Sequence, residues 1–291
     1  MAVDIHIPVL LNEVSEYLAG LKPLVDCTTG AGGHLSALVE KLQDKDLVLA
    51  LDRDRDILSL TKEKLNNNQI NYVHGKFSDI ERHVKKWGHQ PQAILADLGV
   101  SSFQLDNTKR GFSLQRDGPL DMRMDRTQTL TANTLLHRIS EKELREALRS
   151  ESDEKKATSI ARRLKQEVER GKVTSTLKLA QVVREVAGGI GGKIDPATRT
   201  FQTLRRLVNQ EGRELEYFLK NAPPCLAPGG RLAVISFHSG EDRIVKNFFA
   251  QWSREESYRI LTPKPIAPTE EECRSNPRAR SGRLRVLERS V

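Results

Sequence analysis

Short apolar runs alternate with helical patterns in the N-terminal third of the chain. Runs at 24–26, 47–52, 70–74 and 93–100 are typical of short strands, and the last is apolar on both faces until Asp97, as in a parallel strand buried between helices. Helical periodicity and loops replace this alternation from residue 106 to 210, and a strand pattern returns at 231–237. The pattern predicts an α/β domain, residues 1–105 and 211–291, with a helical insertion at 106–210.

A glycine-rich turn lies between the first strand and the helix that follows it. The turn contains Gly30, Gly32 and Gly33, and such a turn lets bare backbone approach a nucleotide-like ligand, because Cβ atoms there would collide with it. The second strand ends at Asp52, about twenty residues later, where a carboxylate can accept hydrogen bonds from both ribose hydroxyls. A plain strand-to-helix connection is the alternative, and Asp52 favours the cofactor site.

The spacing of the glycines distinguishes between two nucleotide cofactors. His34 and Leu35 follow the turn, so the third glycine of the dinucleotide fingerprint G-x-G-x-x-G is missing. NAD is therefore the weaker interpretation. S-adenosylmethionine fits better, since its methionine part needs close backbone approach and polar partners rather than a pyrophosphate cradle.

Two further residues follow strands at the edge where such sheets bind ligands. Phe77 comes just after the strand at 70–74, and either stacks on an adenine ring or belongs to the core. Asp97 ends the apolar part of the strand expected at 93–100. A buried carboxylate without compensation is costly, so we expect Asp97 to have a partner and to lie on the floor of the active site.

Charge is divided unevenly along the chain, whose formal net charge is +8. Residues 106–210 hold 22 Lys and Arg against 14 Asp and Glu, and residues 274–291 hold six Arg against Glu288 alone, whereas the remainder holds 19 basic and 24 acidic residues. This asymmetry is expected where the substrate-facing parts of a protein meet a phosphate backbone. Solvated helical faces are the alternative for the insertion.

Several classes of protein are excluded by composition. No apolar run approaches the ~20 residues that a membrane span requires, and the N-terminus lacks a basic segment before its apolar run, so we expect a cytoplasmic protein that does not enter a membrane. The three cysteines are far apart and odd in number, which argues against a disulfide framework and a zinc site. No metal is expected.

Four further expectations concern individual helices and strands. Ser140 and Glu143 form a capping box that opens a helix, and Ser239 is the expected N-cap of the helix after the strand at 231–237. One long helix is expected to carry Leu204, Leu207 and Leu215. The C-terminal tail is expected to end in an edge strand.

The motifs of the chain resemble those of one family. They cover nearly the whole chain in order and are His6-x-Pro8-Val9-Leu10-Leu11, Asp97-Leu98-Gly99-Val100-Ser101-Ser102, Arg110-Gly111-Phe112-Ser113, Asp117-Gly118-Pro119-Leu120-Asp121-Met122-Arg123-Met124, Pro196-Ala197-Thr198-Arg199-Thr200-Phe201-Gln202, Ser236-Phe237-His238-Ser239 and Asn276-Pro277-Arg278-Ala279-Arg280-Ser281. The set resembles the bacterial 16S rRNA (cytosine-N4)-methyltransferase family (RsmH or MraW). The resemblance implies a class I S-adenosylmethionine-dependent methyltransferase fold, Rossmann-like with a mostly parallel sheet, and an inserted helical substrate-recognition domain.

The resemblance also implies roles for individual residues. The cofactor contacts of the family fall on Gly32, Gly33, His34, Asp52, Phe77, Asp97 and Gln104. The substrate would be a decoding-site cytidine in the 16S rRNA of the small ribosomal subunit, contacted by Arg110, Arg123, Arg199, Ser239, Arg278 and Arg280. From the chemistry of the amine we infer that Asp97 or a nearby carbonyl accepts its proton, with His238 a weaker candidate for removing the proton or positioning the base.

Two other classes of function are compatible with part of this sequence. A small-molecule methyltransferase would share the cofactor unit but would not need a basic insertion, and its substrate binding would be insensitive to salt. A non-catalytic RNA-binding or ribosome-assembly factor would share the basic surface but would not bind the cofactor. The oligomeric state is undecided, with a homodimer as one option.

Overall fold

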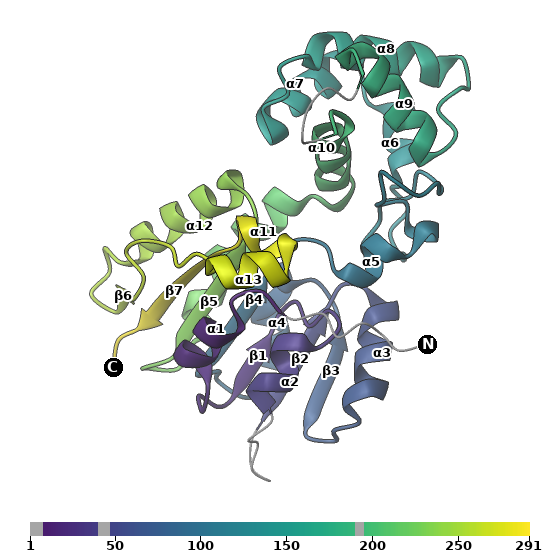
Figure 1. Ribbon diagram of the computed structural model, residues 1–291. Helices are drawn as coiled ribbons and strands as arrows, with labels where there is room; N and C mark the ends of the chain where they lie inside the picture. Colours follow the sequence, from purple (N-terminus) through teal and green to yellow (C-terminus); the bar gives the residue numbers. More distant parts are fainter. Residues whose placement is uncertain (1–7, 40–46, 190–194) are drawn as a thin grey trace. The chain divides into compact units, whose positions relative to one another are not determined.

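The structure, a computed structural model, describes residues 8–39, 47–189 and 195–291. The chain divides into two compact units (Figure 1), which we call the sheet unit, Met1–Gly99 with Gly212–Val291, and the helical unit, Val100–Glu211. The helical unit contains α5 (Ser102–Asp106), η2 (Thr108–Arg110), α6 (Ala132–Arg138), α7 (Glu141–Ser152), α8 (Ala157–Glu169), α9 (Thr176–Ala187) and α10 (Ala197–Asn209).

The sheet unit contains the strands β1 (Leu24–Asp26), β2 (Val48–Asp52), β3 (Ile70–His74), β4 (Ala93–Asp97), β5 (Arg231–Ser236), β6 (Tyr258–Ile260) and β7 (Arg283–Arg289). Its helices are α1 (Leu11–Leu18), α2 (Gly33–Val39), α3 (Arg55–Leu65), η1 (Phe77–Asp79), α4 (Ile80–Trp87), α11 (Glu211–Cys225), which begins at the boundary, α12 (Ser239–Trp252), α13 (Glu270–Ser275) and η3 (Pro277–Ser281).

The seven strands form one sheet in the order β3-β2-β1-β4-β5-β7-β6. Strands β1 to β5 pair in parallel, whereas β7 is antiparallel to β5 and to β6. The chain order reverses between β1 and β4, and a reversal of this kind leaves a crevice at the carboxyl ends of the strands. The predicted α/β class with a mostly parallel sheet is confirmed.

Each face of the sheet has its own hydrophobic core, because successive side chains of a strand point to opposite faces. On one face, alternate strand residues such as Val25, Leu49 and Ile94 pack against α4, α11 and α12. On the other face, their neighbours Leu24 and Val48, with others, pack against α1 and α2. The sheet is therefore covered on both faces, as parallel sheets are.

The C-terminal strand is not at the edge of the sheet. Strand β7 pairs with β5 over six residues, from Arg231 with Glu288 to Ser236 with Arg283, and the three-residue strand β6 covers its other side. The expectation of a C-terminal edge strand is wrong, because β6 is too short to be recognised from its pattern. The apolar positions Leu284, Val286 and Leu287 are accordingly buried.

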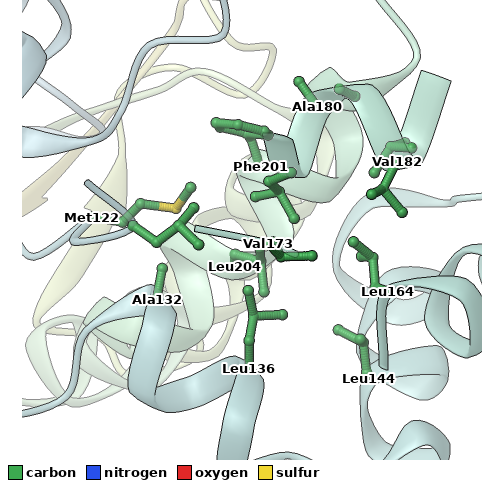
Figure 2. Packing of buried hydrophobic residues seen from close by; sticks show 14 of the residues in the cluster. Met122, Ala132, Leu136, Leu144, Leu164, Val173, Ala180, Val182, Phe201 and Leu204 are labelled. Atoms are coloured by element: carbon green, nitrogen blue, oxygen red, sulfur yellow. The ribbon is translucent and has the colours of Figure 1, made fainter. Parts of the chain in front are cut away.

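The helical unit is built around a separate core. Buried residues from α6, α7, α8, α9 and α10 meet in it, among them Leu136, Leu144, Leu164, Ala180 and Leu204, as Figure 2 shows. The predicted capping box at the start of α7 is confirmed, since the Ser140 hydroxyl accepts from the Glu143 N–H and the Glu143 carboxylate accepts from the Ser140 N–H.

The expected long helix after residue 196 is two helices. Helix α10 ends at Asn209, and Gln210 adopts a left-handed conformation with φ 51° before α11 begins at Glu211. Asn209 is buried, and its amide donates to the carbonyls of Met122 and Arg205. The Asn209 amide thus links the end of α10 to the loop at residue 122, and these hydrogen bonds stabilise the end of the helix at this position.

Candidate functional site

Three aspartates lie at the carboxyl ends of neighbouring strands on one face of the sheet. Asp26 ends β1, Asp52 ends β2 and Asp97 ends β4. Leu24, Val48 and Leu95 belong to the core on the face of α1 and α2, and each aspartate is an even number of residues further along the same strand. Because side chains alternate between the faces, the three carboxyls share that face. The predicted placement of Asp52 and Asp97 at one edge is confirmed.

The glycine turn is fixed by hydrogen bonds to this edge. The Gly30 N–H donates to Asp52 Oδ2 at 2.8 Å, and the Thr61 hydroxyl of α3 donates to the Gly30 carbonyl at 2.6 Å. Gly30 and Gly32 have φ of 51° and 76°, a region that residues with a Cβ rarely adopt. The turn is therefore tied to the end of β2 and to α3.

Packing within the protein explains the two glycines that open α2. A Cβ on Gly32 would lie 2.6 Å from Thr61 Cγ2, and a Cβ on Gly33 would lie 2.5 Å from Pro8 Cγ. The sequence-based argument that glycines here make room for a ligand thus accounts for only part of their presence. Their small size also lets α3 and the segment before α1 approach the turn.

Asp52 combines burial with two backbone donors. Its Oδ2 accepts from Gly30 and its Oδ1 accepts from the Asp54 N–H at 2.8 Å. Burial raises the pKa of Asp52 to about 6, although both N–H groups favour the charged form and lower it. A carboxylate oxygen has two lone pairs, so each oxygen can accept one further hydrogen bond, as from a ribose hydroxyl.

Asp97 is the most perturbed carboxyl of the edge. Burial raises its pKa to about 8, with further contributions from the negative charges of Asp26 and Glu241. Among the described residues Asp97 Oδ1 is buried without a hydrogen-bond partner, and Oδ2 lies 3.6 Å from His34 Nδ1, beyond hydrogen-bond length. His34 is thus the expected partner of Asp97, although it faces only Oδ2 and Oδ1 has no hydrogen-bond partner among the described residues. An orphaned buried acceptor is instead suited to a donor brought by a ligand.

His34 is oriented by the main chain before α1. Its Nε2 lies 2.9 Å from the Val9 carbonyl oxygen, and since a carbonyl only accepts, Nε2 carries the hydrogen. In the neutral ring Nδ1 then holds a lone pair, and this atom faces Asp97 Oδ2.

His238 is the N-cap of α12, in place of the expected Ser239. The His238 Nδ1 accepts from the N–H groups of Gly240 at 3.1 Å and Glu241 at 3.2 Å, while Nε2 lies 3.0 Å from Glu241 Oε1. Ser239 is instead the exposed first residue of the helix. An imidazole ring has two nitrogens, and here both have partners within the protein.

Phe77 and Gln104 belong to different units of the chain. Phe77, in the sheet unit, is half-buried and its ring meets the edge of Phe218 with centroids 5.1 Å apart. Gln104, in the helical unit, is buried in the first turn of α5, where its side chain completes a capping box with Ser101. Phe77 thus joins the core by one part of its ring, and stacking on adenine stays a prediction.

Two of the arginines assigned to substrate are used inside the helical unit. Arg110 is 1% exposed, and its guanidinium donates to the carbonyls of Arg123 and Met124. Arg123 forms a bidentate pair with Asp121 and donates to the carbonyls of Arg126 and Gln128. The expectation that Arg110 offers a surface cation is wrong, because this guanidinium organises the loop from within.

The remaining substrate candidates are on the surface. Arg199 is an exposed residue of α10 in the helical unit. Arg278 and Arg280 are exposed in η3 of the sheet unit, on either side of the fully buried Ala279. These three side chains and that of Ser239 are exposed, and their contact with substrate stays a prediction.

Comparison with known proteins identifies the family. A family model described as the MraW methylase family matches residues 4–290. The chain belongs to this family. The ribosomal RNA small subunit methyltransferase H of Sorangium cellulosum is 44% identical over 293 residues, covering 98% of this chain and 90% of the relative. The protein of the same name from Caldicellulosiruptor saccharolyticus is 41% identical over 304 residues, covering 98% and 99%.

Membership of the MraW methylase family makes the chain a methyltransferase with S-adenosylmethionine as its cofactor, as the sequence predicts. The sheet edge fits that cofactor. Asp52 has free lone pairs for ribose hydroxyls, and the orphaned Asp97 Oδ1 can accept from a ligand N–H group or neutralise a ligand cation. No group of three or more His, Cys, Asp and Glu side chains among residues 8–39, 47–189 and 195–291 is arranged to hold a metal ion.

Sequence reasoning missed two acids of this site. Asp26 is 2% exposed, and burial raises its pKa to about 7, with a smaller contribution from the charge of Asp52. Glu241 is 7% exposed and its Oε2 accepts from the Phe237 N–H at 2.9 Å. Asp26 could have been found from its place at the end of the first strand, beside the glycine turn. Glu241 gave no signal, since an acid in a first helical turn is common.

Proposed function

We propose that this methyltransferase transfers a methyl group from S-adenosylmethionine to N4 of a decoding-site cytidine in the 16S rRNA of the small ribosomal subunit. Two relatives at 44% and 41% identity are named as small-subunit rRNA methyltransferases, which supports the substrate class. The observation that carries the choice of an amine is the partly exposed carboxyl of Asp97, whose Oδ1 is buried without a hydrogen-bond partner among the described residues and whose pKa is raised to about 8.

The cofactor is bound, in this proposal, by Gly32, Gly33, His34, Asp52, Phe77 and Asp97 of the sheet unit, with Gln104 of the helical unit as the seventh contact. S-adenosylmethionine supplies a methyl group on a positively charged sulfur. Asp52 accepts from the ribose hydroxyls with the lone pairs that Gly30 and Asp54 leave free. The backbone at Gly32 and Gly33 borders the methionine part, and Phe77 borders the adenine ring.

Asp97 acts on the cytosine amine. The lone pair of N4 is delocalised into the ring, so the amine is a poor nucleophile until it is oriented and its proton is accepted. A general base works best when its pKa is near the working pH. In the protein without cofactor the pKa of Asp97 is raised to about 8, and the positive sulfur of the cofactor would lower it, so that the carboxyl loses its proton and can accept one from the amine. His238 is the weaker candidate, because its two nitrogens are already engaged by α12 and Glu241.

The exposed cations bind the RNA. Arg199 in the helical unit and Arg278 and Arg280 in η3 contact phosphates, and Ser239 adds a polar contact. Removing a base from its stack costs a few kcal/mol, and phosphate contacts by these side chains offset that cost. Arg110 and Arg123 contribute by shaping the loop rather than by contacting RNA directly.

The test is methylation of small subunits or 16S rRNA from cells that lack this protein. The purified protein and S-adenosylmethionine with an isotopically labelled methyl group are added, and the RNA is digested to nucleosides for mass spectrometry. We expect one labelled N4-methylcytidine per molecule, and none with Asp97→Ala. Label at carbon 5 of cytosine, or no label, would overturn the proposed reaction, and an Asp97→Ala protein with normal turnover and normal cofactor affinity would overturn the role of Asp97.

A further inference from the structure

The segment Pro8–Leu10 lies between the glycine turn and the C-terminal tail of the sheet unit. A Cβ on Gly33 would lie 2.5 Å from Pro8 Cγ, and a Cβ on Gly282 would lie 2.8 Å from Val9 Cγ1. Val9 and Leu10 are buried in the same core cluster as Ala279 and Leu284 of the tail. Residues from both ends of the chain thus enclose this segment.

Leu10 has a backbone conformation that requires support. Its φ of 56° and ψ of 35° are left-handed, and its side chain is fully buried. A leucine in this region is strained by its Cβ, and such residues persist only where the surroundings impose the conformation. The Leu10 N–H donates to Glu272 Oε1 of α13 at 2.7 Å, across 262 positions of sequence. Glu272 is therefore one of the groups that hold the left-handed turn.

The turn at Leu10 determines where the Val9 carbonyl points. That carbonyl accepts from His34 Nε2 at 2.9 Å, which directs His34 Nδ1 towards Asp97 Oδ2. A continuous series of contacts therefore leads from α13 through Leu10 and Val9 to the carboxyl that the proposed function places next to the methyl donor.

We propose that Glu272 is a positioning residue for the cofactor site: by accepting the Leu10 N–H it holds the Val9 carbonyl on His34, and so keeps the imidazole oriented towards Asp97. This inference rests on the proposed assignment of His34 and Asp97 to the cofactor site. The required feature of Glu272 is an acceptor oxygen at the right reach. Its negative charge is not required.

Three substitutions of Glu272 distinguish the position of its acceptor oxygen from its negative charge, and a fourth variant is the control. Glu272→Gln keeps an acceptor oxygen at the same distance and removes the charge, whereas Glu272→Asp keeps the charge and withdraws the oxygen by one methylene group. Glu272→Ala removes both. Glu271→Ala is the matched control, because Glu271 is exposed in the same turn of α13. The dissociation constant of S-adenosylmethionine is measured for each protein by titration calorimetry, with melting curves to verify that each protein is folded.

We expect Glu272→Ala and Glu272→Asp to weaken cofactor binding by up to about tenfold, which corresponds to the loss of one ordinary hydrogen bond. Glu272→Gln should stay within about threefold of the parent protein, and Glu271→Ala should match it. In a background of His34→Ala, the effect of Glu272→Ala should largely disappear, because the two residues act in series.

Three results would overturn this inference: unchanged affinity in Glu272→Ala, normal affinity in Glu272→Asp with impaired Glu272→Gln, or full additivity with His34→Ala. Each of them leaves the proposed function standing if the parent protein binds the cofactor and methylates RNA. If the parent protein gives no heat with S-adenosylmethionine, the proposed function itself fails, and the assignment of Glu272 fails with it. The two failures are therefore distinguishable in one experiment.

Discussion

Replacing Asp97 by Asn should abolish methylation and at the same time stabilise the protein. Asn has nearly the shape of a neutral carboxylic acid but does not ionise. In the folded protein burial and two neighbouring acids disfavour the charged form and raise the pKa of Asp97 from 3.8 to about 8. An acid with a raised pKa binds its proton more tightly in the folded state than in the unfolded state, so the free energy of unfolding falls as pH rises between these two values.

The magnitude follows from that interval. At pH 7 the raised pKa of Asp97 corresponds to an upper bound of roughly 4 kcal/mol of lost stability, at about 1.4 kcal/mol for each tenfold change in ionisation. The side chain is 27% exposed, and solvent screening reduces this to about 2 kcal/mol. For a unit of this size that corresponds to roughly 4–8 °C in Tm.

The assay is thermal unfolding followed by circular dichroism from pH 4 to pH 9. The Tm of Asp97→Asn should equal that of the parent protein near pH 4, exceed it increasingly as pH rises, and level off above pH 8. Glu63→Gln on the exposed surface of α3 is the matched control and should change Tm little at any pH. A difference that is independent of pH, or one that grows towards low pH, would refute the assignment of a raised pKa to Asp97.

Three other predictions concern the same molecule. Binding of S-adenosylmethionine at pH 7 should release close to one proton, because a nearby cation lowers the pKa of Asp97 from about 8; calorimetry in buffers of different ionisation enthalpy measures the number, and no dependence on buffer would contradict it. Arg110→Ala should lower Tm by several degrees, since the carbonyls of Arg123 and Met124 lose their donor. Arg278→Ala and Arg280→Ala should leave Tm unchanged, and each should reduce the salt dependence of RNA binding by about one charge. An unchanged Tm in Arg110→Ala together with a lowered Tm in the other two variants would contradict these assignments. Gly33→Ala should lower Tm and weaken cofactor binding, because its Cβ would lie 2.5 Å from Pro8 Cγ. Wild-type values in both measurements would show that the segment at Pro8 moves aside without loss of stability or affinity.

The parts of the fold that could be predicted from the sequence are those set by local periodicity. Strands β1 to β5 are apolar runs that end at polar residues, and the ends of β2 and β4 gave Asp52 and Asp97 directly. The capping box at Ser140 depends on two residues three positions apart, so it could also be predicted from the sequence. In each case the signal and the structure it specifies lie within a few residues of one another.

The parts that could not be predicted depend on partners distant in sequence. Arg110 occurs in a polar loop, and only the inward turn of the carbonyls at 123 and 124 makes its burial favourable. Strand β7 is interior only because the short β6 pairs with it. Ser239 fits the composition of an N-cap, but the His238 ring occupies the free N–H groups of α12 first. Local propensity is a weak guide wherever such tertiary contacts decide.

Asp26, Asp52 and Asp97 place three carboxyls together at one edge of the sheet, Asp26 buried and the other two half-buried. Each pKa is raised chiefly by burial, and the charge of Asp26 adds to the effect on Asp97. Such a cluster lowers stability in the absence of a cation, and a fold retains it only where the cost brings a function. A cationic ligand beside Asp97 lowers the pKa of this carboxyl, which then loses its proton and forms an ion pair with the ligand. Cofactor binding and the free energy of unfolding are therefore coupled at this edge of the sheet, and the coupling passes through the proton of Asp97.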